Sequence, residues 1–305
     1  MPLPKSLLLL LLLGFLCSSS TEAHVEFGFY NDTCPHAEAI VLHEMTRIIA
    51  EDPTLAGSLL RMQFQDFYCT KGCDASILLD SLNNNVAEKD AVPNKSLRGF
   101  DVTDRVKAKL EEACPGIVSC ADIIAMAARD SVYLANGPYY PIQTGRRDGN
   151  KSEASDLLAN LPPPTANITE LKAFFLQKNL TVKDLVVLSG DTDPSLDMDY
   201  AEKLKRKCKP YDHDDMRTLV KMDLKSPVRF DLGYYKLVSE GKGLFTSDEA
   251  LLHDPETRAY VERQAMASSA EEFFKDFGSS MVSMGKIGAL THQKGEIRKK
   301  CAYVN

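Results

Sequence analysis

Three features that would assign a chain early to a common class are missing here: an excess of basic residues, a long apolar run and an internal repeat. The 305 residues include 36 Lys and Arg against 43 Asp and Glu, a net charge of −7. Nucleic-acid binding is therefore not expected, because no basic excess exists to displace counterions from phosphates. The apolar run at residues 7–13 is too short for a membrane span, which takes about 20 apolar residues. Without a repeat or a shift in composition, we expect a single large domain.

The N-terminus has the features of a secretory signal peptide over residues 1–23. Lys5 precedes the apolar run, and the segment ends on the small residue Ala23. An uncleaved anchor is the alternative. Cleavage after Ala23 removes Cys17 from a total of eight cysteines, so an odd number remains. Export implies an oxidising compartment, where disulfides are expected and one thiol stays without a partner. The Asn-X-Ser/Thr sequons at Asn31, Asn94, Asn167 and Asn179 are consistent with export.

Helical periodicity dominates the rest of the chain. It is found in segments 37–49, 55–67, 99–112, 168–178, 182–189, 200–207, 231–239, 255–264 and 270–285. Ser119 is suited to cap a further helix, whose apolar residues at 123–127 are expected to be buried. Residues 138–148 predict a short irregular hairpin. One predominantly α-helical domain of two packed halves is expected.

Several segments follow one another as they do in a known family. They are residues 29–35 (Phe-Tyr-Asn-Asp-Thr-Cys-Pro), 72–80 (Gly-Cys-Asp-Ala-Ser-Ile-Leu-Leu-Asp), 87–94, 114–122, 145–149 (Gly-Arg-Arg-Asp-Gly), 184–190 and 295–301. Together they resemble the class III plant peroxidases, secreted haem enzymes with two calcium ions and four disulfides. The resemblance implies that residues 24–305 form the all-α plant haem-peroxidase fold, with distal and proximal halves packed as one domain.

The resemblance also implies a chemistry and its participants. Members of the family oxidise phenolic donors with hydrogen peroxide, with haem b and two calcium ions as cofactors. A monomer secreted to the apoplast and cell wall, or to the vacuole, is implied, with cell-wall polymers as further contacts. Peroxide must lose a proton from one oxygen and gain one on the other, which takes a general base and a fixed cation. The iron takes an axial histidine that a carboxylate orients.

On the distal side the family pattern is Arg, two residues, Phe, His and Asp. Here Arg61 matches the residue that stabilises the transition state, but Gln65 holds the position of the base. An amide has no useful basicity near neutral pH, so proton transfer is expected to fail. Asn94 matches the residue that fixes the base, and Pro162 matches the proline that lines the channel for aromatic substrates.

The distal calcium site of the family maps onto a loop of altered length. The matching ligand positions are Asp66, Gly72, Asp74 and Ser76, with Glu88 as the outer-shell carboxylate. Oxygen ligands of this kind suit calcium. The cysteines at 69 and 73 enclose three residues where the family has four, and one residue is inserted between Asp66 and Gly72.

On the proximal side, a segment of the family pattern is missing. In the family, Leu-Ser-Gly is followed by Ala-His-Thr, which supplies the iron ligand and a calcium-binding threonine. Here Gly190 runs directly into Asp-Thr-Asp, in a stretch that resembles family sequence some twenty residues further on. An internal deletion after Gly190 is therefore predicted, and no haem iron ligand is expected. Asp248, which would orient the histidine, is expected to be orphaned.

The same deletion affects the second calcium site and the cysteines. The proximal calcium residues are Asp223, Ser226, Asp231 and the carbonyl of Arg229, a set that lacks its threonine. The cysteine lost with the deletion is the family partner of Cys208, which is predicted to be unpaired. The resemblance leaves the pairs Cys34–Cys114, Cys69–Cys73 and Cys120–Cys301.

Three hypotheses follow. The first is a class III peroxidase by descent that is inactive or strongly impaired, because it lacks both histidines. The second is a non-enzymatic apoplastic binding protein on a peroxidase scaffold. The third is a mis-spliced or mispredicted product of a peroxidase gene, in which a read restoring Ala-His-Thr after Gly190 would return an ordinary proximal site.

Overall fold

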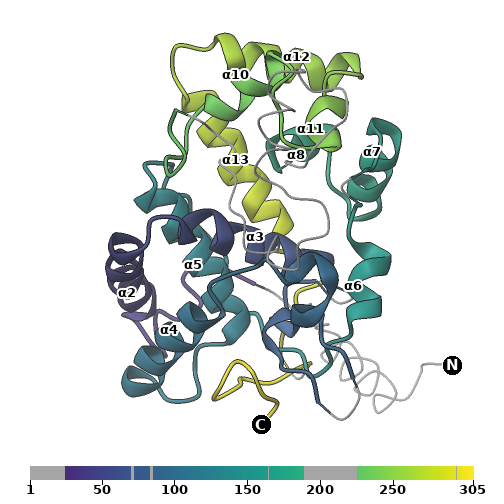
Figure 1. The fold of residues 1–305 in the computed structure, drawn as a ribbon. Helices are drawn as coiled ribbons and strands as arrows, with labels where there is room; N and C mark the ends of the chain where they lie inside the picture. Colours follow the sequence, from purple (N-terminus) through teal and green to yellow (C-terminus); the bar gives the residue numbers. More distant parts are fainter. Residues whose placement is uncertain (1–24, 70–71, 83–84, 164, 189–224, 293) are drawn as a thin grey trace, which may run out of the picture.

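A computed structural model describes residues 25–69, 72–82, 85–163, 165–188, 225–292 and 294–305 (Figure 1). The predicted signal peptide, the junction after Gly190, Asp223 and Cys208 lie outside these residues.

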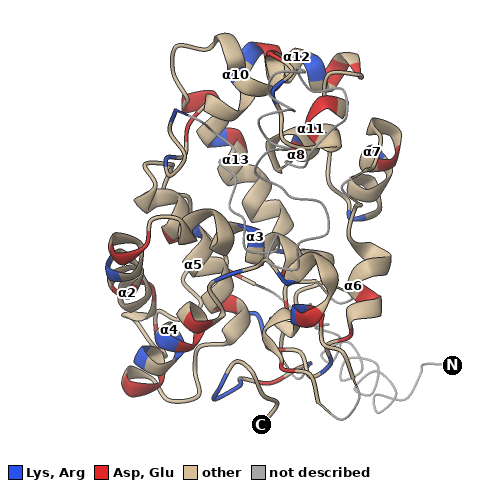
Figure 2. Cartoon of the chain, viewed as in Figure 1, with Lys and Arg blue, Asp and Glu red and all other residues tan. Residues whose placement is uncertain are grey.

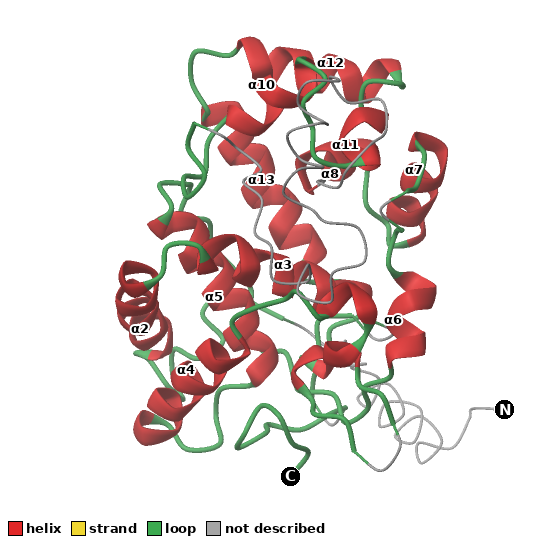
Figure 3. Ribbon diagram, in the orientation of Figure 1, coloured by secondary structure: helices red, strands yellow, loops and turns green. Residues whose placement is uncertain are grey.

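The described part of the chain is all-α, as expected, and its extended pairing is limited to two isolated bridges (Figure 3). The helices are α2 Ala37–Glu51, α3 Leu55–Tyr68, α4 Phe100–Ala113, α5 Cys120–Leu134, α6 Ala154–Asn160, α7 Ile168–Gln177, α8 Val182–Leu188, α10 Gly233–Ser239, α11 Thr246–Ala250, α12 Pro255–Met266 and α13 Glu271–Met284. Three short 3₁₀ helices are η1 Ser76–Leu78, η2 Glu88–Asp90 and η3 Val92–Asn94. None of the described helices is long and apolar enough to cross a membrane.

Several helices begin at the residues that their capping chemistry predicts. The Ser119 hydroxyl accepts a hydrogen bond from the Asp122 amide at 3.1 Å and starts α5. Asn167 starts α7 through a capping box with Glu170. Asp254 caps α12, and Pro255 follows it at the first helical position, where a missing N–H costs nothing.

The helices pack in two groups that share one hydrophobic core. α5 lies at the centre of the first group and contacts α2, α3 and α4, so almost all of its residues are buried. In the second group α8 contacts α7, α12 and α13, and α10 packs on α12. Buried apolar side chains from both groups belong to one cluster. The expectation of two halves packed as one domain is met.

The predicted hairpin at residues 138–148 is wrong. These residues pair with distant segments instead of with each other: Thr144 bridges Glu26, and Asp148 bridges Glu296. The physical reason is that polar side chains in this stretch, such as Asp148, are buried and bind partners elsewhere in the chain. The sequence periodicity also missed the short helix α6.

Two of the three predicted disulfides are present. Cys34 pairs with Cys114 and Cys120 with Cys301, closing loops with sequence separations of 80 and 181. The prediction of a Cys69–Cys73 bridge is corrected, because both residues are buried free thiols. Each thiol donates to the backbone carbonyl of another residue. Cys69 Sγ donates to the Gln65 carbonyl at 3.3 Å, and Cys73 Sγ donates to the Met284 carbonyl at 3.8 Å.

Basic and acidic residues are interspersed along α2 and α4 (Figure 2). Glu44 on α2, for example, bridges Arg47 on its own helix and Arg105 on α4, at 3.2 and 2.9 Å. Such pairs contribute little individually.

Candidate functional site

Helix α3 carries the predicted distal residues on its last turns. Gln65 and Asp66 are buried, whereas Arg61, one turn earlier, is half-buried. The Arg61 guanidinium donates to the Ser96 hydroxyl at 3.1 Å and to the Pro93 carbonyl. The structure therefore ties Arg61 to the loop that holds Asn94.

Asn94 and Gln65 both present buried amide oxygens. Asn94 is 1% exposed, and its side-chain N–H donates to the Glu88 carbonyl at 2.9 Å. Neither Asn94 Oδ1 nor Gln65 Oε1 receives a hydrogen bond from the described residues. Both positions that the family pattern predicts to lie at the distal base therefore hold buried neutral amides. The burial of Asn94 also makes its sequon unsuited to carry a glycan, whereas Asn31, Asn167 and Asn179 are exposed.

Three carboxyl groups of the predicted distal calcium site are buried together. Asp66, Asp74 and Glu88 are each at most 2% exposed. The Ala75 amide donates to Asp66 Oδ2 and the Ser76 amide to Asp74 Oδ1, both at 3.1 Å. Asp66 Oδ1 and Glu88 Oε2 receive no hydrogen bond from the described residues.

Burial and mutual repulsion raise the pKa values of these acids. The pKa of Asp66 is raised well above its ordinary value, first by burial and then by the charge of Asp74. Burial raises the pKa of Glu88 to about 7. The pKa of the nearby Cys69 thiol is also raised, by burial and by the negative charge of Glu88 and Asp66. Buried acidic groups gather here, and the positive charge of Arg298 acts against the raised pKa of Asp66.

This donor set fits a calcium ion. No group of three or more His, Cys, Asp or Glu side chains among the described residues is arranged as a metal site. The predicted calcium ligands do not require such a group, because they combine the carboxylates of Asp66 and Asp74 with carbonyl and hydroxyl oxygens from Gly72 and Ser76. An unsatisfied Asp66 oxygen and the raised acid pKa values are what a hard dication would relieve.

Two glycines allow the distal loop, residues 72–76, to pack closely. Gly72 has φ +91°, and a Cβ there would lie 2.4 Å from the Ile287 carbonyl. A Cβ on Gly149 would lie 2.2 Å from Asp74 Oδ2, so only glycine leaves room for that carboxylate. Gly149 stands in one of the family-like segments, but the pattern alone assigned it no role.

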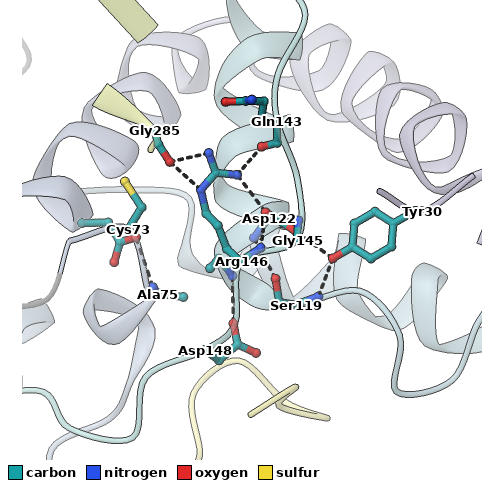
Figure 4. A network of polar contacts seen from close by, with 12 residues as sticks. Tyr30, Cys73, Ala75, Ser119, Asp122, Gln143, Gly145, Arg146, Asp148 and Gly285 are labelled. Atoms are coloured by element: carbon teal, nitrogen blue, oxygen red, sulfur yellow. Dashed lines mark hydrogen bonds and ion pairs between the residues drawn. The ribbon is translucent and has the colours of Figure 1, made fainter. Parts of the chain in front are cut away.

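A buried ionic network joins Tyr30, α5 and the end of α13 (Figure 4). Arg146 donates to Asp122 at 2.8 Å and twice to the Gly285 carbonyl after α13, at 2.9 and 2.6 Å. The Tyr30 hydroxyl donates to the same Asp122 at 2.7 Å, and burial and that charge raise the pKa of Tyr30. The Cys73 thiol also donates to the Met284 carbonyl. Together with this bond, the network fixes the end of α13 against the distal half.

On the proximal side, three of the residues predicted for a second calcium site lie in hydrogen-bond contact. The Ser226 hydroxyl donates to Asp231 Oδ2 at 2.9 Å, and the Arg229 amide donates to the Ser226 carbonyl at 3.0 Å. Asp231 Oδ1 accepts a hydrogen bond at 2.7 Å from the amide of Gly233, the first residue of α10. Asp223 lies outside the described residues, so its position relative to this pair stays a prediction.

Asp248, predicted to have no histidine to orient, binds other groups of the fold. Asp248 is fully buried, and its Oδ1 accepts the Tyr234 hydroxyl at 2.7 Å. Its Oδ2 accepts the backbone amides of Leu244 and Phe245, at 2.8 and 3.1 Å, which caps α11. Burial and the Asp248 charge raise the pKa of Tyr234, so its phenolate form is disfavoured. The neutral Tyr234 phenol thus donates to one oxygen of the Asp248 carboxylate, and the two backbone amides donate to the other.

The described residues do not fit haem iron. All four described histidines, His36, His43, His253 and His292, are exposed. The sequence has no histidine between His43 and His213, and His213 lies outside the described residues. Tyr234, with its raised pKa, is not suited to act as a tyrosinate ligand. Pro162 lies half-buried after α6, at the position predicted for the substrate channel.

Comparison with known proteins agrees with this architecture. The family model named Peroxidase matches residues 41–267. The chain belongs to the class III plant peroxidase family. It is 47% identical to Peroxidase 1 of Oryza sativa subsp. japonica, with 98% of each chain covered. It is 46% identical to Peroxidase 56 of Arabidopsis thaliana, with 95% of this chain and 94% of the relative covered. Peroxidase 27 of the same plant is 46% identical, with 97% of both chains covered.

Proposed function

We propose that this chain is a secreted peroxidase-family protein that has lost normal haem-peroxidase turnover. The observation that carries the proposal is the distal pair Gln65 and Asn94: the base position holds an amide, and Asn94 Oδ1 has no donor among the described residues. Without a base, the proton on peroxide has no acceptor of suitable pKa. The family's substrates, hydrogen peroxide and phenolic donors, are then not turned over at family-like rates.

The length of the alignment to the rice relative supports a deletion in this chain. The alignment to the rice relative spans 324 positions, more than the 305 residues of this chain. Gaps must therefore lie opposite part of the rice protein. A deletion after Gly190 accounts for the missing iron ligand and for an unpaired Cys208. It does not account for Gln65, which lies on α3 far from that junction in the sequence.

We further propose secretion to the apoplast, cell wall or vacuole, and calcium at the distal site. The signal-like residues 1–23 and the family support export. The buried carboxyl groups of Asp66 and Asp74 support calcium. At the proximal site Ser226 and Asp231 would form an incomplete calcium set, because the threonine is missing.

The test is a haemin titration of the protein secreted from an expression host, beside the rice relative. We expect no strong Soret band and no guaiacol oxidation above that of free haemin. The variant Gln65→His should remain inactive, because the proximal ligand is still absent. A strong Soret band with guaiacol oxidation near the rate of the rice protein would refute the proposal. A cooperative thermal transition distinguishes a folded pseudoenzyme from a misassembled gene product.

A further inference from the structure

The distal loop is held by an arginine from the opposite end of the chain. Arg298 is fully buried. Its Nη2 donates to the Ala75 carbonyl at 2.7 Å and to the Asp74 carbonyl at 3.2 Å, while Nη1 donates to the Cys301 carbonyl. One planar guanidinium therefore joins two consecutive loop carbonyls to the C-terminal strap, residues 296–301.

Neighbouring contacts fix the position of Arg298 itself. The Arg298 amide donates to Asp148 Oδ2 at 2.8 Å, and the other oxygen of that carboxylate accepts the Ala121 amide at 2.9 Å. The Asp148 backbone also bridges Glu296. The disulfide Cys120–Cys301 closes the end of the strap onto α5. These contacts fix the backbone around Arg298, so the guanidinium stays in place against the distal loop.

Arg298 also supplies charge where the calcium ligands accumulate the opposite sign. It is the cation that lowers the pKa of Asp66, against the raising effects of burial, Asp74 and Glu88. The Arg298 guanidinium donates its hydrogen bonds to backbone carbonyls. The side-chain oxygens of Asp66 and Asp74 accept hydrogen bonds from backbone amides instead. The arginine thus orients the loop without taking the positions of the carboxylate ligands.

We propose that Arg298 is a positioning residue for the distal calcium site, which sets the backbone of Asp74 and Ala75 before any ion binds. This inference rests on the proposed binding of calcium at that site. The two carbonyl contacts fix the direction of the chain at Asp74, and hence where its carboxylate and the Ser76 amide point. Residues that orient metal ligands in this way commonly change metal affinity about 10- to 100-fold when replaced.

The test compares calcium binding by the wild-type chain, Arg298→Lys and a matched control, Arg129→Lys. Lysine keeps the charge but cannot span two carbonyls with one planar group. Arg129 is also fully buried and ion-paired, but with Asp130 and Glu38. Calorimetric titration with calcium alone should show affinity weakened at least about 10-fold in Arg298→Lys. Affinity in Arg129→Lys should be unchanged.

The outcomes are separable. If the wild type binds no calcium, the proposed calcium site fails, and this inference fails with it. If the wild type binds and Arg298→Lys binds equally well, with the same fall in melting temperature in calcium and in chelator, the residue is merely structural and the inference alone is wrong.

A measurement on the wild type covers the case in which Arg298→Lys does not fold. Amide hydrogen exchange at Ala75 and Ser76 is followed in chelator and in calcium. If Arg298 sets the loop in advance, both amides are protected in chelator, and calcium adds less than about 10-fold to that protection. Free exchange in chelator, with protection only in calcium, would overturn the inference.

Discussion

Two buried polar residues, one on each side of the molecule, differ in how far their side-chain oxygens receive hydrogen bonds. On the proximal side, Asp248 accepts the Tyr234 hydroxyl and two backbone amides, so both of its oxygens have donors. On the distal side, Asn94 keeps its bond to the Glu88 carbonyl, but its Oδ1 receives none from the described residues. Both residues are buried, so the difference lies in what stands next to them.

The difference shows how the local surroundings decide whether a buried polar side chain contributes to stability. Asp248 lies in the first turn of α11 and beside Tyr234, so its carboxylate contributes to stability without an imidazole. Asn94 ends the short 3₁₀ helix η3, where its side chain caps nothing. A buried acceptor left without a donor costs about 1–3 kcal/mol. The distal side still carries that cost.

Replacing each residue in turn is the sharpest way to break this comparison. Asp248→Ala should lower the free energy of unfolding by about 3–4 kcal/mol, because a half-buried phenol and two amides lose their acceptor. Asn94→Ala should cost about 1–2 kcal/mol, since it removes one donated bond and one unsatisfied oxygen together. Chemical denaturation measures both.

Tyr234→Phe serves as the control for the proximal side, and about 1–1.5 kcal/mol is expected from its single hydroxyl. Equal losses for Asp248→Ala and Asn94→Ala would contradict the distinction between the two sides.

The pH dependence of stability sharpens the distal side. Since burial raises the pKa of Glu88 from 4.5 to about 7, the folded state holds a proton that the unfolded state has released between those values. Unfolding free energy therefore falls as pH rises from about 4.5 to 7. Asp66, whose pKa is also raised, acts in the same direction, and the Asp74 charge adds to both shifts.

In chelator, the melting temperature should fall by about 2–6 °C over this interval. Calcium should oppose the fall, because it binds the ionised carboxylates. The variant Glu88→Gln should flatten the profile. A wild-type profile in chelator that is flat or rises between pH 5 and 7 would show that these acids do not keep their protons in the fold.

The last prediction concerns the number of reactive thiols and involves no change in stability. In the folded protein, Cys69 and Cys73 should not react with a thiol reagent, because they are buried and burial raises the pKa of Cys73 to about 12. After denaturation without reductant, Cys69, Cys73 and Cys208 should all react. If only one thiol appears, Cys69 and Cys73 are bridged after all.

The fold could largely be predicted from the sequence, because helix signals are local. Ser119, Asn167 and Pro255 mark helix starts by hydrogen bonds or ring geometry within one turn. The disulfides of Cys34 and Cys120 came from the resemblance. The hairpin at 138–148 failed, since its partners Glu26 and Glu296 lie far along the chain.

For the candidate site, the sequence could predict which residues are involved but not the contacts that they make. Gln65 and Asn94 could be located by pattern, but their unsatisfied oxygens depend on what surrounds them. Tyr234 could not be found as the partner of Asp248, because nothing in the sequence shows that a phenol fourteen residues away reaches that carboxylate. Arg298 was missed for the same reason, at a separation of 224 residues from Asp74.

That separation has a consequence for biosynthesis. At about 5–20 residues per second, the ribosome makes Arg298 roughly 10–45 s after Asp74. During that interval the acidic distal loop has no guanidinium to hold it, and Cys120 has no Cys301 to pair with. The final few residues thus complete the first half of the protein. A chain truncated before them would leave synthesis with an unclamped acidic loop and a reactive thiol, two marks by which an incomplete product differs from a finished one.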